Sequence, residues 1–319
     1  MALYTHFIGI DIGKFEVVAA VHGSKTTQTF ANSLEGFDSF IVTFKSLLKD
    51  ALIILETTGG YEKLFLKALV KLNIPVHRAN TRHVKAFVRS LGHKGKTDAL
   101  DALALARFGF ERHDRLPLYQ PPKPSMETLQ SLAMRRLDLN RLLVAEKNRL
   151  QAPDSSEFVK KSCKALIESI QQQLHELIEE LKNLIELNPE LVKKQKVLQT
   201  VPGIGDITSS MLAVLFPELG HLNRRQIASL AGLAPHPNES GTKVGYRMTR
   251  GGRRHVRSII FMAAMAAAHS KSRLGDAYRK LIERGKKKMV ALTAIMRRII
   301  VIANARIKEM LLNKLDHAS

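Results

Sequence analysis

The sequence predicts a mixed α/β domain at the N-terminus and a mainly helical remainder. Three short apolar runs, residues 6–13, 15–23 and 26–32, are separated only by tight turns, which is typical of an antiparallel meander. The stretch 34–49 then has apolar residues at helical spacing, and the apolar run 51–56 predicts a buried strand. A meander followed by βαβ crossovers forms a mixed sheet with helices packed on it.

Two further helices and another strand complete this N-terminal domain. A helix begins near Tyr61, a strand spans 74–80, and a helix spans 97–110 with Thr97 as its N-cap. We place the end of the domain near residue 115, because a proline-rich linker follows. The prolines of this linker are Pro117, Pro121, Pro122 and Pro124.

The middle of the chain, residues 116–190, is predicted to contain the linker and coiled-coil helices. Apolar residues from Leu174 to Ile185 recur at helical spacing, with acids and amides on the opposite face. Such a face packs either on another helix of the same chain or on a second copy of the protein. The pattern alone favours neither alternative.

The chain is strongly basic. Its 319 residues include 50 Lys+Arg and 29 Asp+Glu, a formal net charge of +21. From Gly241 to Met310 there are 18 basic and 3 acidic residues, so the excess is concentrated in a third region, residues 191–319. This charge favours a polyanionic partner, with nucleic acid ahead of an anionic membrane surface or a ribosomal-type structural role.

Cysteine content and hydropathy indicate the compartment. Cys163 is the one cysteine of the sequence, which excludes a disulfide framework and a cysteine-based metal site. No N-terminal signal is visible, and the apolar stretches near residues 260 and 300 are short or broken by Arg297 and Arg298. We expect a soluble cytoplasmic protein, associated with the nucleoid and not with a membrane.

Four acids form the candidate metal site. Asp98 and Asp101 are three positions apart, so they are neighbours in the first turn of one helix. The helix dipole favours each by only ~0.3–1 kcal/mol, which leaves most of their repulsion to be offset by a cation. Asp11 lies in the first strand, where an unpaired acid is costly, and Glu56 ends the strand 51–56. We expect all four carboxylates to converge.

Converging carboxylates suit phosphodiester chemistry. Mg²⁺ prefers oxygen ligands, and two such ions roughly 4 Å apart can clamp the attacking and leaving oxygens of a phosphodiester. Taken singly, Asp98 is typical of a helix start and Glu56 of a strand end. The stretch "GIDIGK" (9–14) is also typical of sugar kinases and actin-like ATPases, but the sequence has no second glycine-rich phosphate loop with an acid beside it.

Two basic or glycine-rich features are candidates for nucleic-acid binding. The turn "PGIG" contains Gly203 and Gly205 between two helical runs, as in a helix-hairpin-helix, and would offer backbone N–H groups to phosphates. A plain helical turn is the alternative. An arginine cluster occupies the end of the stretch 234–252 and the residues directly after it, and we expect this stretch to lack regular structure because of its Pro and Gly content. Its members are Arg247, Arg250, Arg253, Arg254 and Arg257.

These motifs together resemble those of the insertion-sequence-110 (1111 subgroup) transposases and the related pilin-gene invertases. "GIDIGK", "LETTGGYE" (55–62) and "KTDALDALALARFG" (96–109) are similar to the Asp-Glu-Asp-Asp (DEDD) motif of that family's RuvC-like, RNase H-like domain. Residues 135–153 resemble the start of its coiled-coil segment. Residues 201–216, 228–241 and 250–264 resemble its C-terminal transposase domain.

The resemblance implies a mechanism and partners. In this family a C-terminal serine followed by glycine is the nucleophile that becomes joined to DNA, and it corresponds to Ser240. The four acids would bind Mg²⁺, with His236 and Glu239 as candidate proton acceptors. The family acts on DNA as dimers that join into tetramers, and its transposases use a structured non-coding bridge RNA as guide.

Three other functions stay open at this point. The invertases of the family recombine fixed DNA sites and share every motif quoted above. A hydrolytic RuvC-like junction nuclease would need the four acids but not Ser240. An architectural nucleic-acid binder would need neither.

Overall fold

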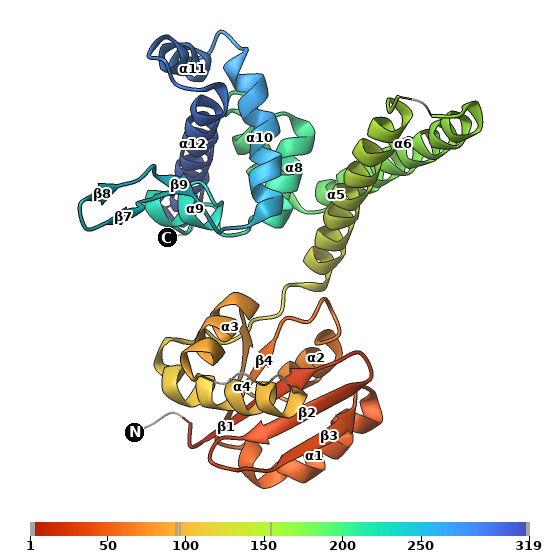
Figure 1. The fold of residues 1–319 in the computed structure, drawn as a ribbon, viewed down its shortest axis with the longest axis vertical. Coiled ribbons are helices and arrows are strands. Elements are labelled where there is room, and N and C mark those ends of the chain that lie inside the picture. The colour runs from red at the N-terminus through yellow and green to blue at the C-terminus, as the bar shows by residue number, and fades with distance from the viewer. Residues whose placement is uncertain (1–3, 93–94, 96, 154, 317–319) are drawn as a thin grey trace. The chain divides into compact units, whose positions relative to one another are not determined.

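The computed structural model describes residues 4–92, 95, 97–153 and 155–316, and the chain divides into two compact units (Figure 1). Unit 1 is Met1–Pro122 and unit 2 is Lys123–Ser319. Unit 1 contains a five-stranded mixed sheet, whereas unit 2 is mainly helical. The predicted fold class, a mixed α/β domain followed by helices, is confirmed at this level.

The sheet of unit 1 has the strand order β3-β2-β1-β4-β5. The first three strands form the predicted antiparallel meander, and β1, β4 and β5 are parallel neighbours joined by helical crossovers. This arrangement puts β1 at the centre of the sheet. The strands are β1 (His6–Ile12), β2 (Glu16–Val21), β3 (Thr27–Ala31), β4 (Ala51–Glu56) and β5 (Val76–Ala79).

Helices cover both faces of this sheet. On one face, Ile8 and Ile10 of β1 pack with aromatic residues of α1 (Leu34–Leu48) and α2 (Lys63–Lys71). On the other face, Phe7 packs with α3 (Thr81–Ser90) and α4 (Asp98–Arg112), after which a short 3₁₀ turn follows. Because side chains alternate along a strand, the odd-numbered residues of β1 face α4.

Helix α3 was not predicted. Its buried residues are only Val84 and Phe87, and polar and basic residues surround them, so the apolar pattern is too short to stand out. Asn80, at the end of the predicted strand 74–80, is the N-cap of this helix. Its side chain accepts a hydrogen bond from the N–H of Arg82 and caps the helix.

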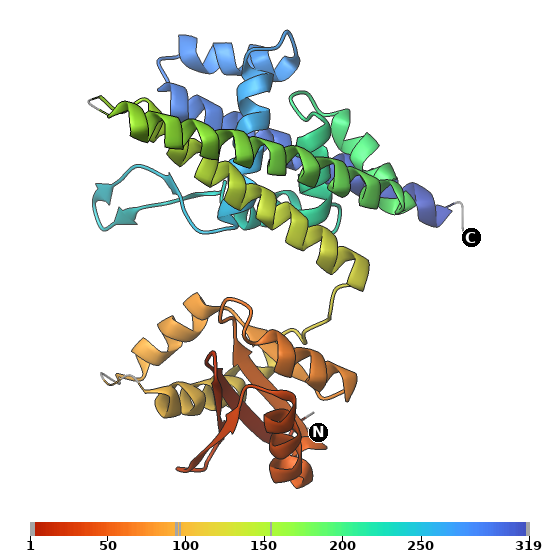
Figure 2. The same ribbon diagram turned by 90° about the vertical axis from the view of Figure 1, so that its right-hand side faces the viewer.

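Unit 2 begins with two long helices, α5 (Pro124–Leu150) and α6 (Glu157–Glu186), that pack along one another (Figure 2). Ile170 and Leu174 of α6 contact Leu139 of α5 in a buried cluster. The amphipathic face of α6 therefore packs on helices of the same chain, which is the first of the two alternatives that the pattern left open. The assignment of Pro124 to the linker was wrong, since proline is tolerated in the first turn and Pro124 begins α5.

In the described part of unit 2, six more helices surround a large apolar core, to which α8, α10 and α12 contribute Leu212, Ile260 and Ile299. Within the described residues, no helix is long and apolar enough to cross a membrane. The helices are α7 (Pro189–Gln199), α8 (Asp206–Leu215), α9 (Arg224–Leu230), α10 (Arg254–Ala268), α11 (Arg273–Glu283) and α12 (Lys288–Asp316).

The stretch 234–252 is more regular than expected. It forms two short antiparallel pairs, β6 (Pro235–His236) with β9 (Met248–Thr249) and β7 (Glu239–Ser240) with β8 (Lys243–Val244). The expectation that this stretch lacks regular structure was wrong. Gly241 adopts φ +56°, and this conformation permits the tight reversal that joins β7 to β8. The resulting hairpin projects beyond the helices of unit 2 (Figures 1 and 2).

Candidate active site

Gly9 brings α4 directly onto the central strand. A Cβ atom at Gly9 would lie 2.1 Å from the carbonyl oxygen of Ala102 and 2.2 Å from the amide nitrogen of Ala106. Only glycine allows this approach. Asp11 lies two residues further along β1, on the same face as Gly9. The first turn of α4, which carries Asp98 and Asp101, is therefore brought to Asp11.

The parallel register of β1 and β4 brings Glu56 to the same place. Ile10 of β1 pairs with Leu55 of β4, so the next residues, Asp11 and Glu56, are neighbours on adjacent strands. Parallel strands are ~4.8 Å apart. Leu52 and Ile54 of β4 are buried on the α4 face, and alternation gives Glu56 the same face.

The local structure around Asp98 and Asp101 is as predicted. The Oγ1 of Thr97 accepts a hydrogen bond from the N–H of Leu100 at 3.2 Å, which caps α4. Both aspartates lie in the first turn of the helix. Their carboxylates are thus placed near unpaired backbone N–H groups, where negative charge is favoured.

The electrostatics of Asp11 show that the acids share one neighbourhood. Burial raises the pKa of Asp11 from 3.8 to about 6, and the negative charges of Asp101, Asp98 and Glu56 raise it in the same direction. A hydrogen bond to the backbone of Ile12 acts the opposite way and is outweighed. A carboxyl whose pKa is raised by burial and by neighbouring carboxylates is typical of a cation site.

The coordination geometry of such a site is not formed. In the described part of the chain, no group of three or more His, Cys, Asp or Glu side chains could hold a metal ion as it stands. The donor chemistry nevertheless fits a hard divalent cation, because all four groups offer carboxylate oxygens.

Sequence reasoning missed Glu62, a buried acid next to this site. Its carboxylate is completely buried and forms an ion pair with Arg78 of β5. The same carboxylate accepts hydrogen bonds from the N–H groups of Thr58 and Gly60, in the loop that follows Glu56. The sequence contains no clear signal of this burial, since an acid directly before a helix is favoured there and is ordinarily exposed.

Ser240 lies in unit 2, in the second strand pair of the projecting hairpin. It pairs with Lys243 across a reversal at Gly241, and it is exposed. Glu239 lies 3.6 Å from Arg247, measured from carboxylate to guanidinium. The base of the hairpin is held by the N–H of Gly245, which donates to the carbonyl of Asn238 at 2.9 Å. A small hydroxyl is therefore presented on a narrow, cation-bearing ribbon.

The five candidate arginines have different environments. Arg253 donates to the carboxylate of Glu218, at 2.9 Å for one of the two contacts, and to the carbonyl of Leu215 at 3.2 Å. Arg257 donates to the carbonyl of Gly232 at 3.3 Å. Both guanidinium groups thus already have protein partners. The side chains of Arg250 and Arg254 are exposed, as is that of Arg247.

The two glycines of the PGIG turn also differ. Gly203 has φ +89°, and a Cβ there would lie 2.2 Å from the carbonyl oxygen of Ala263 in α10. Close packing of the turn on α10 explains this glycine without a ligand. Gly205 is exposed at the N-cap of α8, with nothing within 4 Å of a Cβ built there. Its surroundings leave space for a phosphate.

Comparisons with known proteins agree with these motifs. The family model described as "Transposase", for DEDD transposases of the IS110 type, matches residues 8–153. The model described as "Transposase IS116/IS110/IS902 family" matches residues 195–279. Both matched ranges lie where the acids and the arginine cluster occur.

Three curated relatives are similar over different lengths. The pilin gene-inverting proteins of Moraxella lacunata and Moraxella bovis are each 30% identical over 315 residues, covering 95% of this chain and 96% of the relative. An uncharacterized 43.6 kDa protein of insertion element IS110 from Streptomyces coelicolor is 29% identical over 160 residues, or 48% of this chain and 37% of that protein.

Among solved structures, the chain is similar to T. thermophilus RuvC in complex with Holliday junction substrate. It is 16% identical with a TM-score of 0.27, over 36% of this chain and 100% of that chain. The assignment depends instead on the family models and on the nearly full-length relatives. The chain therefore belongs to the IS110 family of transposases and invertases, and it is a DNA recombinase.

Proposed function

We propose that this recombinase cuts and rejoins DNA with a Mg²⁺ site made by Asp11, Glu56, Asp98 and Asp101 and with Ser240 as its nucleophile. The observation that carries the proposal is the convergence of the four acids at Asp11, whose pKa is raised to about 6 by burial and by the three neighbouring charges. A bound divalent cation would relieve the repulsion among these carboxylates, which is otherwise relieved only by protonation of one of them. Unit 1 is, in this proposal, a RuvC-like domain.

The chain's residues have separate tasks in the proposed reaction. Bound Mg²⁺ would supply Lewis-acid stabilisation of the phosphodiester oxygens. The Oγ of Ser240 attacks the phosphorus, a serine–phosphate ester forms, and the bond to a deoxyribose oxygen breaks. The serine proton leaves to a base, for which His236 and Glu239 are candidates. The released deoxyribose oxygen takes up a proton, and the reverse attack rejoins DNA without ATP.

The positive charge of unit 2 supports DNA as the substrate. Arg247, Arg250 and Arg254 have exposed side chains beside the Ser240 hairpin, and their charge favours phosphate contacts. Arg253 and Arg257 have a structural role, because their hydrogen bonds to Glu218 and to the carbonyl of Gly232 hold the end of the hairpin region on unit 2. Gly205 would add a backbone N–H at the start of α8.

The partners are part of the same proposal. A structured bridge RNA would select the DNA sites, and the active form would be a dimer that joins into a tetramer. Site-specific inversion without a guide is the second candidate function, and the observation that favours it is the 30% identity to pilin gene-inverting proteins along nearly the whole chain. Sequencing of the nucleic acid that copurifies with the protein separates the two. A discrete structured RNA supports the guided reaction, and its absence supports inversion.

An isosteric substitution that removes one negative charge tests the metal site. Asp101→Asn should abolish Mg²⁺-dependent strand cleavage while the protein still folds and binds DNA. The matched control is Asp38→Asn, which removes an exposed acid from α1 of the same unit. If Asp101→Asn cleaves DNA as fast as Asp38→Asn, the four-acid site is not catalytic. An architectural binder would show no cleavage in any variant.

A further inference from the structure

A basic cleft lies between α11 and α12 of unit 2, apart from the residues considered so far. It has a volume of about 380 Å³. Three of its basic side chains, Arg273, Lys280 and Arg284, come from α11 and its C-terminal end, and Arg298 comes from α12. The acid of its lining is Asp276.

Helical spacing explains how these cations are gathered. Arg273, Lys280 and Arg284 are separated by seven and four residues, so they lie along one stripe of the helix surface. At 1.5 Å per residue the stripe extends roughly 16 Å, which is long enough to meet more than one phosphate of a nucleic-acid backbone. Arg298 closes the cleft from the second helix. The cations therefore form a row rather than a single point charge.

The charges in this row are not balanced by the protein. Asp276 lies 2.5 Å from the guanidinium of Arg279, to which its charge is already committed. In the described residues, the four cations of the cleft take part in no ion pair. Each of the four side chains is exposed. A concave surface lined by charges of one sign concentrates the potential and attracts a counter-charged ligand.

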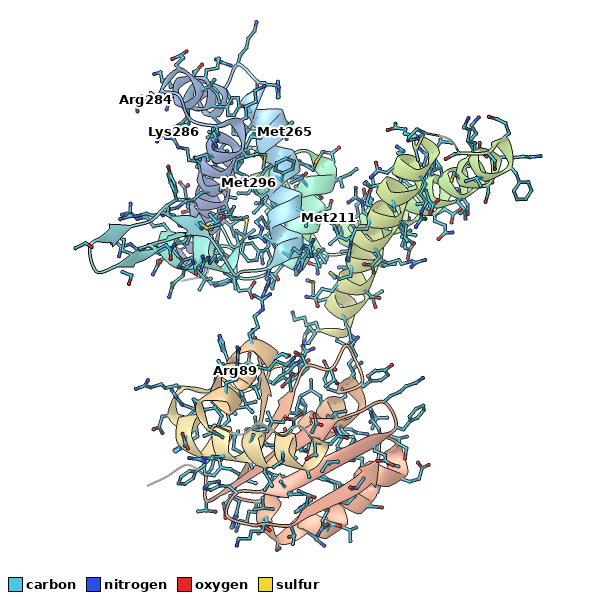
Figure 3. All side chains as sticks on the ribbon, viewed as in Figure 1. Arg89, Met211, Met265, Arg284, Lys286 and Met296 are labelled. Atoms are coloured by element: carbon cyan, nitrogen blue, oxygen red, sulfur yellow. The ribbon has the colours of Figure 1, made fainter. Side chains whose placement is uncertain are left out.

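The turn after α11 extends the positive surface. Arg284 and Lys286 lie close to one another in this turn (Figure 3), and Lys287 and Lys288 follow directly. Lys286, Lys287 and Lys288 are all exposed. Three exposed lysines thus follow the cleft residue Arg284 along the chain to the start of α12.

The composition of the cleft identifies the chemistry of the ligand. Three arginines offer forked N–H donors that match phosphate oxygens, and a lysine adds a point charge. No aromatic ring lines the cleft, so the bases of a nucleic acid would have nothing to stack on. These features suit contacts with the backbone and not the reading of sequence.

We propose that the α11–α12 cleft binds the phosphate backbone of duplex DNA, as a second contact surface separate from the arginine cluster at 247–257. The proposal rests on the proposed function in taking DNA as the substrate. Binding here would be independent of sequence and strongly dependent on salt. The site would hold DNA against unit 2 while the hairpin carries Ser240.

The test compares two triple variants of the full-length protein. Arg273→Gln, Lys280→Gln and Arg284→Gln together remove three charges from the cleft. Lys161→Gln, Lys164→Gln and Lys182→Gln together remove three exposed charges from α6 as the matched control. Fluorescence anisotropy of a labelled duplex of arbitrary sequence, titrated at several salt concentrations, gives the affinity and its salt slope. Circular dichroism melting verifies that both variants fold.

The cleft variant should bind duplex DNA at least ~10-fold more weakly than the control, with a salt slope lower by about two to three, because each lost phosphate contact removes ~0.9 from the slope. Equal DNA affinity and equal salt slope in the two variants would contradict the proposal that the cleft binds DNA. Weakened binding of a structured RNA of equal length, with duplex binding unchanged, would also overturn it and assign the cleft to RNA.

A second measurement on the wild-type protein needs no variant. Duplex DNA should protect Lys280 from acetylation, measured by mass spectrometry, whereas Lys161 should stay reactive. Equal labelling of Lys280 with and without DNA contradicts the proposal. Inorganic phosphate alone should not give this protection, and if it does, the cleft is a site for a free anion. If the wild-type protein binds no duplex DNA at all, both the proposed function and the cleft proposal are wrong. If it binds duplex DNA but Lys280 is not protected, only the cleft proposal is wrong.

Discussion

Glu62 and Arg78 form an ion pair in which the Glu62 Oε1 lies 2.5 Å from the Arg78 Nη2 and the Glu62 side chain is 0% exposed. Burial acts to raise the pKa of Glu62, but hydrogen bonds from the backbone and from Arg78 more than offset it and hold the pKa below its ordinary value. The N–H of Gly60 donates to the other oxygen at 2.8 Å. The pair therefore fixes the loop that begins directly after Glu56.

Glu62→Gln should destabilise unit 1 by about 2–4 kcal/mol, because Arg78 loses its charged partner and the partly buried N–H groups of Thr58 and Gly60 lose a charged acceptor. Since the folded-state pKa is lowered, the stabilisation is fully present above the ordinary pKa of about 4.3 and is lost as the pH falls through the folded value. Urea unfolding at pH 7 measures it, with the exposed Glu16→Gln as control, expected within ~0.5 kcal/mol of wild type. Equal midpoints for the two variants would show that the pair does not support the loop.

Asp11→Asn should raise the melting temperature above that of wild type at pH 8 in the presence of a chelator. The folded-state pKa of Asp11 is raised to about 6, so its ionisation destabilises the folded protein progressively as the pH rises from 3.8 to 6. The difference between the proteins should therefore vanish below pH 3.8. Addition of Mg²⁺ should stabilise wild type more than Asp11→Asn. An equal Mg²⁺ response in both proteins would mean that Asp11 is not a ligand.

Arg253→Ala and Arg254→Ala should affect different properties, stability and DNA binding respectively, although the residues are adjacent. Arg253→Ala removes the bonds to Glu218 and to the carbonyl of Leu215, and should cost about 1–3 kcal/mol of stability. Arg254→Ala should change stability by less than ~0.5 kcal/mol and weaken binding to all DNA sequences alike. Thermal melting and anisotropy distinguish the two outcomes. A stability loss in Arg254→Ala of the same size would contradict the assignment.

Gly9→Ala should displace α4 and impair the site without removing any of its acids. The new methyl would lie 2.1 Å from the carbonyl oxygen of Ala102, and backbone atoms at that distance have to move. We expect a loss of at least ~2 kcal/mol in stability and a smaller thermal shift on adding Mg²⁺. Gly95→Ala is the control, since its nearest contact would be an ordinary 3.5 Å to Leu100. A wild-type thermal shift with Mg²⁺ in Gly9→Ala would show that Mg²⁺ binding does not depend on the close packing of α4 on β1.

Local patterns predicted the sheet of unit 1 and the position of three of its helices. The apolar runs of β1, β2 and β4 were long and bounded by turn residues, and Thr97 has the chemistry of an N-cap. Helix α3 was missed, because two buried residues among basic ones leave no clear period. The pairs β6–β9 and β7–β8 were missed because strands of two residues are defined by their hydrogen bonds and not by a pattern.

The candidate site divides in the same way. The neighbourhood of Asp11, Glu56, Asp98 and Asp101 was predictable from strand order and helix spacing, and the raised pKa of Asp11 agrees with it. The partner of Arg253 was not, since Glu218 is 35 positions away and only the packed unit brings the two together. The division of the chain at residues 115 and 190 stays a prediction, as do the coiled coil and the helix-hairpin-helix.

The proposed mechanism predicts a covalent bond between Ser240 and DNA. The measurement is a reaction of labelled DNA with the protein and Mg²⁺, quenched in detergent and separated on a denaturing protein gel. Wild type should show a DNA-dependent band that protease removes, because a serine–phosphate ester survives denaturation. Ser240→Ala should fold and bind DNA as wild type does and show no such band. Cleavage of DNA by Ser240→Ala at the wild-type rate would contradict the account and assign the attack to water.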